Sequence, residues 1–316
     1  MPELRLATFN CENLMMRCDF RKAGIANARQ RLTDVDNALV AEQVDSVFDV
    51  LSEDDRTLTA QALAATEADV CALQEVENLV ALTAFDTRYI ARWAGQPFTE
   101  RVLHEGNDSR GIDVALLSRL PVVYQRSHAR RTFGALGVAP PRGNSVNDYA
   151  FRRDCLEVDV MKDGRVLTLF VCHFKSMHGG RKKTRNVRLA EAAAVRQLIR
   201  LRFTNPADED WVVLGDFNDY REVDGVAVGN SGLGPLLDDG FAVDLACRAI
   251  PDAFDRWTHH YPEDDTYGAL DHILLSPRLA AQNPAPATRI IRAGSPYHAA
   301  RYTGPRFPGI GWMAPK

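Results

Sequence analysis

The apolar residues of this chain fall in short runs that suit buried strands. Val166 to Phe174 is among the longest of these runs, and it is far too short to span a membrane. Ala68 to Gln74 and Trp211 to Leu214 are typical of strands buried on both faces of a sheet. With 46% hydrophobic and 25% charged residues, the composition is that of a globular protein. These features exclude collagen, a coiled coil, an intrinsically disordered chain and a membrane protein.

Helical segments alternate with the strands along the chain. The apolar spacing predicts helices over Val35 to Leu51, Leu58 to Glu67 and Asn186 to Phe203. Two strand-like runs, one ending at Val160 and the other starting at Val166, flank an Asp-Gly turn signal, which predicts a hairpin. No linker-like stretch divides the 316 residues, and a chain of this length can bury a core without disulfides or metals. We therefore expect a single α/β sandwich domain over residues 1–316.

The charge balance bears on nucleic-acid binding. The chain has 38 basic and 42 acidic residues, which give a net charge of −4. This balance counts against a protein that coats nucleic acid nonspecifically, but it suits an enzyme with a local basic rim. Residues able to form such a rim are found in Arg126 to Arg131, Arg152 to Arg153 and Arg181 to Arg185. Taken singly, each of these runs is more typical of a solvated face.

The cysteines and the amino terminus bear on the cellular compartment. Six cysteines are spread along the chain without a Cys-x-x-Cys pair, which predicts buried, reduced thiols rather than a zinc or redox site. The residues from Met1 to Asn10 lack the basic and apolar regions of a secretory signal. We therefore expect a cytoplasmic protein that neither contacts a membrane nor needs an obligate protein partner.

Polar residues end five of the predicted strands. They are Asn10, Glu75, His173, the pair Asp216 and Asn218, and the pair Asp271 and His272. Taken singly, each is an ordinary turn or cap residue. Carboxylates and amides that gather at neighbouring strand ends supply the oxygen ligands that a hard cation such as Mg²⁺ requires. A histidine among them supplies proton transfer near neutral pH, as cleavage of a phosphate ester needs.

Six blocks of sequence carry a family resemblance. In chain order they are Ala7 to Asn13, Leu73 to Val76, Arg110 to Leu117, Cys172 to Ser176, Gly215 to Asp219 and Leu270 to Leu275. With these blocks the chain resembles the endonuclease/exonuclease/phosphatase superfamily, which shares the DNase I-like fold, and in particular its bacterial nuclease-like members. The resemblance covers residue 4 to about residue 279. It implies a four-layered α/β/β/α sandwich, in which two packed mixed β-sheets are flanked by helices.

The resemblance implies a metal site and a catalytic site. Glu75 matches the principal metal-ligand glutamate, Asn10 the asparagine beside it that holds metal or phosphate, and Glu12 a second acidic residue near the metal in some relatives. His173 matches the histidine that contacts the scissile phosphate and acts in acid–base catalysis. Asp216 matches the aspartate that orients or deprotonates the attacking water.

Further matches concern the phosphate and the last histidine. Asn218 corresponds to the amide that steadies the phosphate, and Asp271 to the aspartate that orients the final catalytic histidine. Strand alternation turns His272 away from Asp271, which predicts a structural role for His272. The basic candidates for substrate binding are Arg110, Lys175 and Arg181. For Glu12, Arg110 and Asp113, a rim position or a structural ion pair is an equally good interpretation.

The chain departs from the family pattern from about residue 294. The family closes with Ser-Asp-His, and the nearest segment here is Ser295 to His298, where Tyr297 takes the place of the acid. Either the segment has been replaced, or His298 enters the site from an irregular loop as a catalytic residue. Because the family's last aspartate often helps to hold the metal, its loss would either weaken activity or leave a larger share of metal binding to Glu75 and Asp271.

These observations predict a metal-dependent phosphodiester hydrolase with Mg²⁺ as its cofactor and Mn²⁺ as the alternative. The favoured activity is that of a nuclease, which cleaves DNA or RNA by in-line attack of an activated water. One alternative keeps the chemistry but acts on a small phosphoester. We expect Ser176 to Arg185 to form a basic, flexible loop, and a need for this loop with polymer but not with small substrates would favour the nuclease. Another is a catalytically impaired member that acts as a binding protein. A pure binding role does not require the acids and the histidine that five blocks retain.

Overall fold

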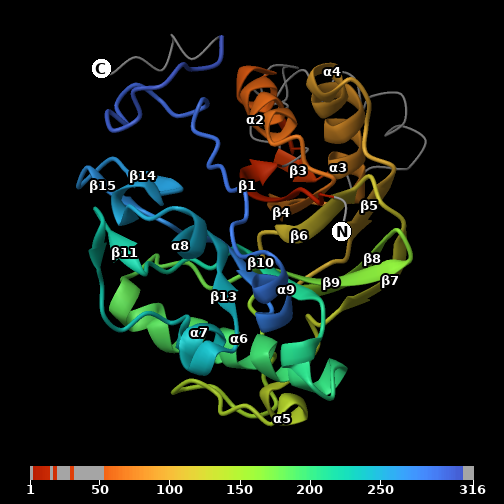
Figure 1. The fold of residues 1–316 in the computed structure, drawn as a ribbon, viewed down its shortest axis with the longest axis vertical. Coiled ribbons are helices and arrows are strands. Elements are labelled where there is room, and N and C mark those ends of the chain that lie inside the picture. Colours follow the sequence, from red (N-terminus) through yellow and green to blue (C-terminus); the bar gives the residue numbers. More distant parts are fainter. Residues whose placement is uncertain (1–2, 15–16, 20–28, 32–52, 309–316) are drawn as a thin grey trace.

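The computed structural model describes residues 3–14, 17–19, 29–31 and 53–308, and two β-sheets packed face to face form its centre (Figure 1). The first sheet has the order β1-β4-β6-β5, with β1 (Leu6–Leu14), β4 (Val70–Val76), β6 (Asp113–Ser118) and β5 (Glu100–Leu103). The second has the order β13-β16-β10-β9-β8-β7, with β13 (Val243–Asp244), β16 (Asp271–Leu275), β10 (Trp211–Asp216), β9 (Arg165–His173), β8 (Cys155–Lys162) and β7 (Val122–Ser127).

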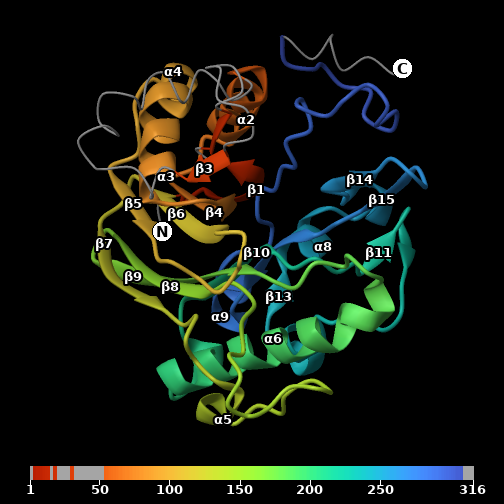
Figure 2. The ribbon, with the colours of Figure 1, turned by 180° about the vertical axis from the view of Figure 1, so that it is seen from behind.

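Helices cover the outer face of each sheet (Figures 1 and 2). Over the first sheet lie α2 (Glu53–Ala65), α3 (Leu79–Phe85), the π-helical turn η3 (Asp86–Ile90) and α4 (Ala91–Ala94). Over the second lies α6 (Arg181–Arg202), against which α5 (Phe133–Leu136) and α7 (Gly234–Leu237) pack. Leu116 and Leu214 are fully buried in the layer between the sheets. The architecture is the predicted four-layered α/β/β/α sandwich.

Shorter elements complete the described part of the chain. A small sheet has the order β12-β11-β15-β14, with β12 (Val226–Ala227), β11 (Glu222–Val223), β15 (Thr266–Gly268) and β14 (His259–Tyr261). Strands β2 (Arg17–Asp19) and β3 (Arg29–Arg31) form a separate pair. The remaining helices are α8 (Leu245–Ala249), α9 (Pro277–Gln282), η4 (Pro206–Asp208), η5 (Asp238–Gly240) and η6 (Ala253–Asp255). None of the helices in the described ranges is long and apolar enough to cross a bilayer.

Several element boundaries differ from the sequence prediction. The hairpin between β8 and β9 turns at Asp163 and Gly164 as predicted, and both residues have a positive φ. Strand β1 does not end at Asn10 but continues to Leu14 through an irregular register. Helix α6 begins at Arg181, so the basic residues 181–185 lie on a helix rather than in a loop. The helix predicted over Val35 to Leu51 falls outside the described residues.

The cysteines whose side chains the structure describes carry free thiols. Cys155 and Cys172 face each other across β8 and β9, with their Sγ atoms 3.6 Å apart, and both are fully buried. Burial raises the pKa of Cys71 to about 12, which keeps that thiol protonated and unreactive. This is the behaviour expected of reduced core thiols, whereas the side chain of Cys18 lies outside the described part.

The segment 294–308 contains neither helix nor strand, as its Gly and Pro content predicts. Arginine side chains hold it in place. The guanidinium of Arg301 lies 3.6 Å from the ring centre of Phe254 and 4.0 Å from that of Tyr267, and it donates a hydrogen bond to Asp224. Arg306 donates hydrogen bonds to backbone carbonyls of the same segment, which fixes its path without a strand ladder.

Gly215 lies where strands β9 and β10 approach each other too closely for a side chain. Its φ is +145°, and a Cβ atom built there would lie 1.9 Å from the carbonyl oxygen of Cys172. We expect Gly215→Ala to lower the free energy of unfolding by at least ~4 kcal/mol, because the clash involves backbone on both sides. Gly137→Ala is the matched control, since Gly137 has a φ of +66° but open space around it, and should cost ~1–2 kcal/mol. Urea unfolding measures both, and equal losses would refute the close-approach explanation.

Candidate active site

The register of the second sheet brings three predicted site residues together. Strand β9 runs parallel to β10, and Asp216 pairs with His173. Strand β16 runs antiparallel to β10, and Asp216 pairs on that side with Asp271. Asp271 therefore begins its strand, contrary to the prediction that the polar residues all end strands. Because β16 is antiparallel to β10, Asp271 still lies at the same end of the sheet as Asp216 and His173. The three side chains stand side by side because directly paired residues share a face.

The first sheet supplies Asn10 and Glu75. Strand β1 runs parallel to β4, with Asn10 paired to Gln74, so Asn10 lies beside Glu75. Glu75 has a φ of +62° at a shift in the ladder between β4 and β6, and Glu12 has a φ of +50° within the irregular end of β1. Such left-handed backbone is costly for residues other than glycine and is concentrated at functional sites.

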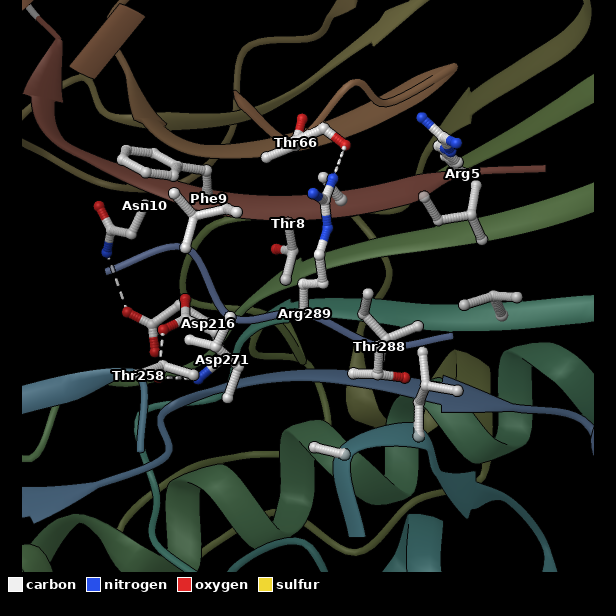
Figure 3. A pocket seen from close by; sticks show the side chains of 18 of the residues that line it. Arg5, Thr8, Phe9, Asn10, Thr66, Asp216, Thr258, Asp271, Thr288 and Arg289 are labelled. Carbon is white, nitrogen blue, oxygen red and sulfur yellow. Dashed lines mark hydrogen bonds between the residues drawn. The ribbon is translucent and has the colours of Figure 1, made fainter. Parts of the chain in front are cut away.

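Asn10 joins the two sheets at the site (Figure 3). Its Nδ2 donates to Oδ2 of Asp216 at 2.9 Å, and Figure 3 draws this bond. The same Nδ2 also donates to Oε1 of Glu75 at 3.4 Å. Its Oδ1 accepts a hydrogen bond from the backbone N of Glu12 at 2.9 Å. The Nε2 atom of His173 lies 3.8 Å from Glu75 and 3.7 Å from Asp216. Both sheets thus contribute to one cluster of two carboxylates, an amide and an imidazole.

Burial sets the charge states in this cluster. Burial, and next the positive charge of Arg153, lower the pKa of His173 well below the ordinary histidine value. The imidazole is therefore neutral at neutral pH. Burial, and next the negative charge of Asp271, raise the pKa of Asp216, and burial also raises the pKa of Asp271. A nearby positive charge or a bound proton would therefore stabilise these two adjacent buried carboxylates.

Asn218 supports Asp216 from the loop that follows β10. Its backbone N donates to Oδ1 of Asp216 at 2.7 Å, and its side-chain Nδ2 donates to the carbonyl oxygen of Phe174 at 3.2 Å. The backbone of Asn218 has a φ of +50°. Asn218 is 8% exposed, and these bonds hold Asp216 and the end of β9 together.

Thr258, and not His298, contacts Asp271. The Thr258 hydroxyl donates to Oδ2 of Asp271 at 2.7 Å, while Oδ1 is buried without a hydrogen-bond partner in the described part of the chain. His298 lines the cleft that also contains Asp216 and Asp271, but its side chain is exposed and its ring centre lies 5.5 Å from that of His260. No sequence pattern points to Thr258, because it precedes Asp271 by 13 residues in an irregular segment.

The basic candidates have different surroundings. Arg110 forms an ion pair with Asp108, and its side chain is 52% exposed. Burial, and next the charge of Arg153, lower the pKa of Lys175. Arg181 donates from Nε to Asp219 at 2.7 Å, which anchors the start of α6 to the loop after β10. Its side chain is only 26% exposed, so this predicted substrate contact already has a structural partner.

His272 has the structural role that alternation predicts. Its Nδ1 lies 3.0 Å from Oδ2 of Asp244, and its ring stacks on Phe217 with the ring centres 5.6 Å apart. Both side chains of the His272–Asp244 pair are nearly fully buried. This contact lies on the side of β16 opposite to Asp271, which keeps His272 out of the carboxylate cluster.

The donors near Glu75 suit a hard cation. Within the described residues, no group of three His, Cys, Asp or Glu side chains forms a ready-made metal site. Mg²⁺ is usually held by one or two carboxylates, with water and substrate phosphate completing its octahedron. Glu75 offers one carboxylate whose side chain is 15% exposed. Burial, and next the negative charge of Glu75, raise the pKa of the nearby Glu12. Asn10 turns its nitrogen, rather than its oxygen, toward the carboxylates.

Comparison with known proteins gives a family match and several solved structures of low sequence identity. A model of the Endonuclease/Exonuclease/phosphatase family matches residues 7–286. A search of curated protein sequences gives no match. Among solved structures, a hairpin-deletion mutant of Staphylococcus aureus beta toxin is 12% identical, with 92% of this chain and 90% of that chain covered and a TM-score of 0.49. An endonuclease/exonuclease/phosphatase family protein from Bacteroides thetaiotaomicron is 14% identical, with 87% and 83% covered and a TM-score of 0.49. The human Nocturnin catalytic domain is 14% identical, with 71% and 75% covered and a TM-score of 0.48.

The two-sheet sandwich, with acids, an amide and a histidine gathered where strand ends of both sheets meet, defines a protein of the DNase I-like class. Because the family model spans most of its length, the chain belongs to the Endonuclease/Exonuclease/phosphatase family. Members of this family are phosphoester hydrolases, and they commonly use divalent metals.

Proposed function

We propose that this protein is a divalent-metal-dependent phosphodiesterase that cleaves DNA or RNA. One observation carries the proposal: Asn10, Glu75, His173 and Asp216 meet in a single cluster drawn from both sheets. Carboxylates that can hold a cation and accept a proton from water stand beside an imidazole that can bind a phosphate oxygen. Packing does not require this arrangement, and its buried acids destabilise the fold unless a ligand compensates them.

Each residue of the cluster has its own proposed role in hydrolysis. When bound at Glu75, with Glu12 beside it, Mg²⁺ or Mn²⁺ would neutralise charge on the phosphate oxygens. Asp216 accepts a proton from the attacking water, and its raised pKa makes it a stronger base than an ordinary aspartate. Asn10 holds Asp216 and Glu75 at a fixed separation through its two hydrogen bonds. Each residue acts from a position fixed by a strand end.

His173 acts in this proposal as a neutral hydrogen-bond donor rather than as a charged acid. Its Nε2 faces the two carboxylates, while its Nδ1 is buried without a hydrogen-bond partner among the described residues. The acceptors around Nε2 favour the tautomer with the proton on that atom. Both carboxylates lie beyond hydrogen-bond distance from Nε2, so in this proposal its N–H donates to a phosphate oxygen and stabilises the charge that develops in the transition state. This proposed role differs from the acid–base catalysis that the family resemblance implies for His173.

A comparison of substrates tests the proposed function. Supercoiled plasmid, single-stranded RNA and a small chromogenic phosphodiester are each incubated with Mg²⁺. We expect cleavage of at least one polymer with a kcat/KM roughly 100-fold above that of the small ester, because a polymer adds binding energy away from the reacting bond. Turnover of the small ester alone would contradict the nuclease assignment. If the folded protein hydrolyses none of the three substrates, this result would indicate a binding protein instead.

A further inference from the structure

Asp108 holds two arginines, Arg110 and Arg153, beside the carboxylate cluster. It lies in the loop 104–112, which joins β5 to β6. Its Oδ1 accepts hydrogen bonds from the backbone N of Arg110 at 2.9 Å and from Nε of Arg110 at 3.0 Å. Its Oδ2 accepts from Nη2 of Arg110 at 3.0 Å. This bidentate contact fixes the plane of the guanidinium although the Arg110 side chain is 52% exposed.

The loop is anchored next to the carboxylate cluster. Asp113, the first residue of β6, pairs with Val76, which directly follows Glu75 in β4. The carboxylate of Asp113 also accepts a hydrogen bond from the backbone N of Gly106 at 2.8 Å, which closes the loop. The hydrogen bond to Asp108, with the negative charges of Asp108 and Glu75, raises the pKa of Arg110. The loop therefore presents Arg110 on the Glu75 side of the site.

A second arginine connects Asp108 to the strand of His173. Nε of Arg153 lies 2.9 Å from Oδ2 of Asp108, and Nη1 of Arg153 donates to the carbonyl oxygen of Phe174 at 2.9 Å. The side chain of Arg153 is 4% exposed, so this link belongs to the core. Burial acts to raise the pKa of Asp108, but hydrogen bonds from Arg110 and the charge of Arg153 outweigh it and lower that pKa to about 2. Asp108 is therefore ionised at neutral pH.

We infer that Asp108 is a positioning residue that presents Arg110 to a phosphate next to the scissile one. This role rests on the proposed nuclease function and extends it to the flanking backbone. The side chains of Glu75 and His173 are 15% and 1% exposed, whereas that of Arg110 is 52% exposed. A phosphate against Arg110 thus lies outside the buried cluster. Holding the guanidinium in place beforehand removes much of the entropy cost of ordering a long side chain on binding.

A double-mutant cycle tests this role on the polymer that the wild type cleaves best. We expect Asp108→Asn and Arg110→Ala each to raise KM about 10-fold, with kcat changed less than about threefold, because the contact is made equally before and during the reaction. The double variant should have the KM of Arg110→Ala within about twofold, since Asp108 acts through Arg110. Effects that multiply in the double variant, or a loss confined to kcat, would overturn the inference.

Asp210→Asn is the matched control. Asp210 is 11% exposed, as Asp108 is, and it also holds two arginines, Arg165 and Arg278, but it precedes β10 at the end opposite to Asp216. We expect its KM to stay within about twofold of the wild type. An equal rise in KM would show that loss of any such acid weakens binding through general structure, and that result would overturn the inference.

The salt dependence of KM distinguishes a lost phosphate contact from a general structural change, which leaves that dependence unaltered. In the Arg110→Ala protein, the slope of log KM against log salt concentration should fall by about 0.7 to 0.9, the value for one lost phosphate contact. This measurement stands even if Asp108→Asn fails to fold, and an unchanged slope would overturn the inference. The wild type separates the two proposals: no cleavage of any polymer would overturn both, whereas normal cleavage with a failed cycle would overturn only the role of Asp108.

Discussion

Glu75→Ala is expected to abolish metal-dependent turnover while the protein stays folded. Mutation of residues that merely orient metal ligands costs 10–100-fold in metal affinity or activity, so loss of the ligand itself should cost more than ~100-fold. The Glu75 side chain is partly exposed at a strand end and adopts a strained φ of +62°. Its removal therefore takes little from the core. Initial rates with Mg²⁺, together with a thermal melt of each protein, measure the effect.

Glu67→Ala is the control for this substitution. Glu67 precedes β4 at the end opposite to Glu75, and its side chain is 61% exposed, with its contacts to Arg5 and Arg289 at the surface. Surface ion pairs of this kind contribute little to stability, so the variant should match the wild type in rate and melting temperature. Activity of Glu75→Ala within threefold of the control would contradict the assignment of Glu75 to the metal.

His173→Ala is expected to lower kcat by roughly 10²–10³-fold, which is the usual cost of losing one positioned hydrogen-bond donor to a developing oxyanion. His173 is nearly fully buried between Glu75 and Asp216, and no other imidazole in the described ranges lies within ion-pair distance of those two acids. Single-turnover kinetics at saturating substrate measure the loss in the chemical step.

His298→Ala provides the comparison. The His298 side chain is exposed and has the ring of His260 as its neighbour, so its loss should change kcat by less than about threefold. A large loss in His298→Ala and a small one in His173→Ala would reverse our assignment. Thermal melts of both variants are needed, because His173 is a core residue and truncation leaves a cavity beside Phe174.

The sequence was sufficient to predict which side chains gather at the site where the register of neighbouring strands brings them together. The register of neighbouring strands brings His173, Asp216 and Asp271 to one edge, and this follows once the strands are recognised. The prediction that Asp271 ends its strand is wrong, because Asp271 is the first residue of β16. The local sequence pattern does not show whether a polar residue starts or ends a strand. Sequence periodicity also placed the start of α6 several residues too late, since its first turns are basic and lack an apolar repeat.

Contacts that depend on irregular segments could not be predicted. Thr258 reaches Asp271 from a loop, and Asp108 holds Arg110 through a turn whose shape depends on Asp113 and Gly106. The positive φ of Glu75 likewise arises from a shift in the ladder between β4 and β6, which tertiary packing imposes. Local propensity and periodicity report neither kind of feature, because both depend on residues distant in the sequence.

The most direct test of the account is hydrolysis of bis(p-nitrophenyl) phosphate by the wild-type protein with Mg²⁺ or Mn²⁺, with EDTA, and with EDTA followed by excess metal. This substrate reports phosphodiester cleavage without requiring a polymer contact. We expect release of nitrophenol with metal, none with EDTA, and recovery when metal is restored, with no activity in Glu75→Ala under any condition. Hydrolysis that continues undiminished in EDTA, or that survives in Glu75→Ala, would contradict a metal-dependent site at this cluster.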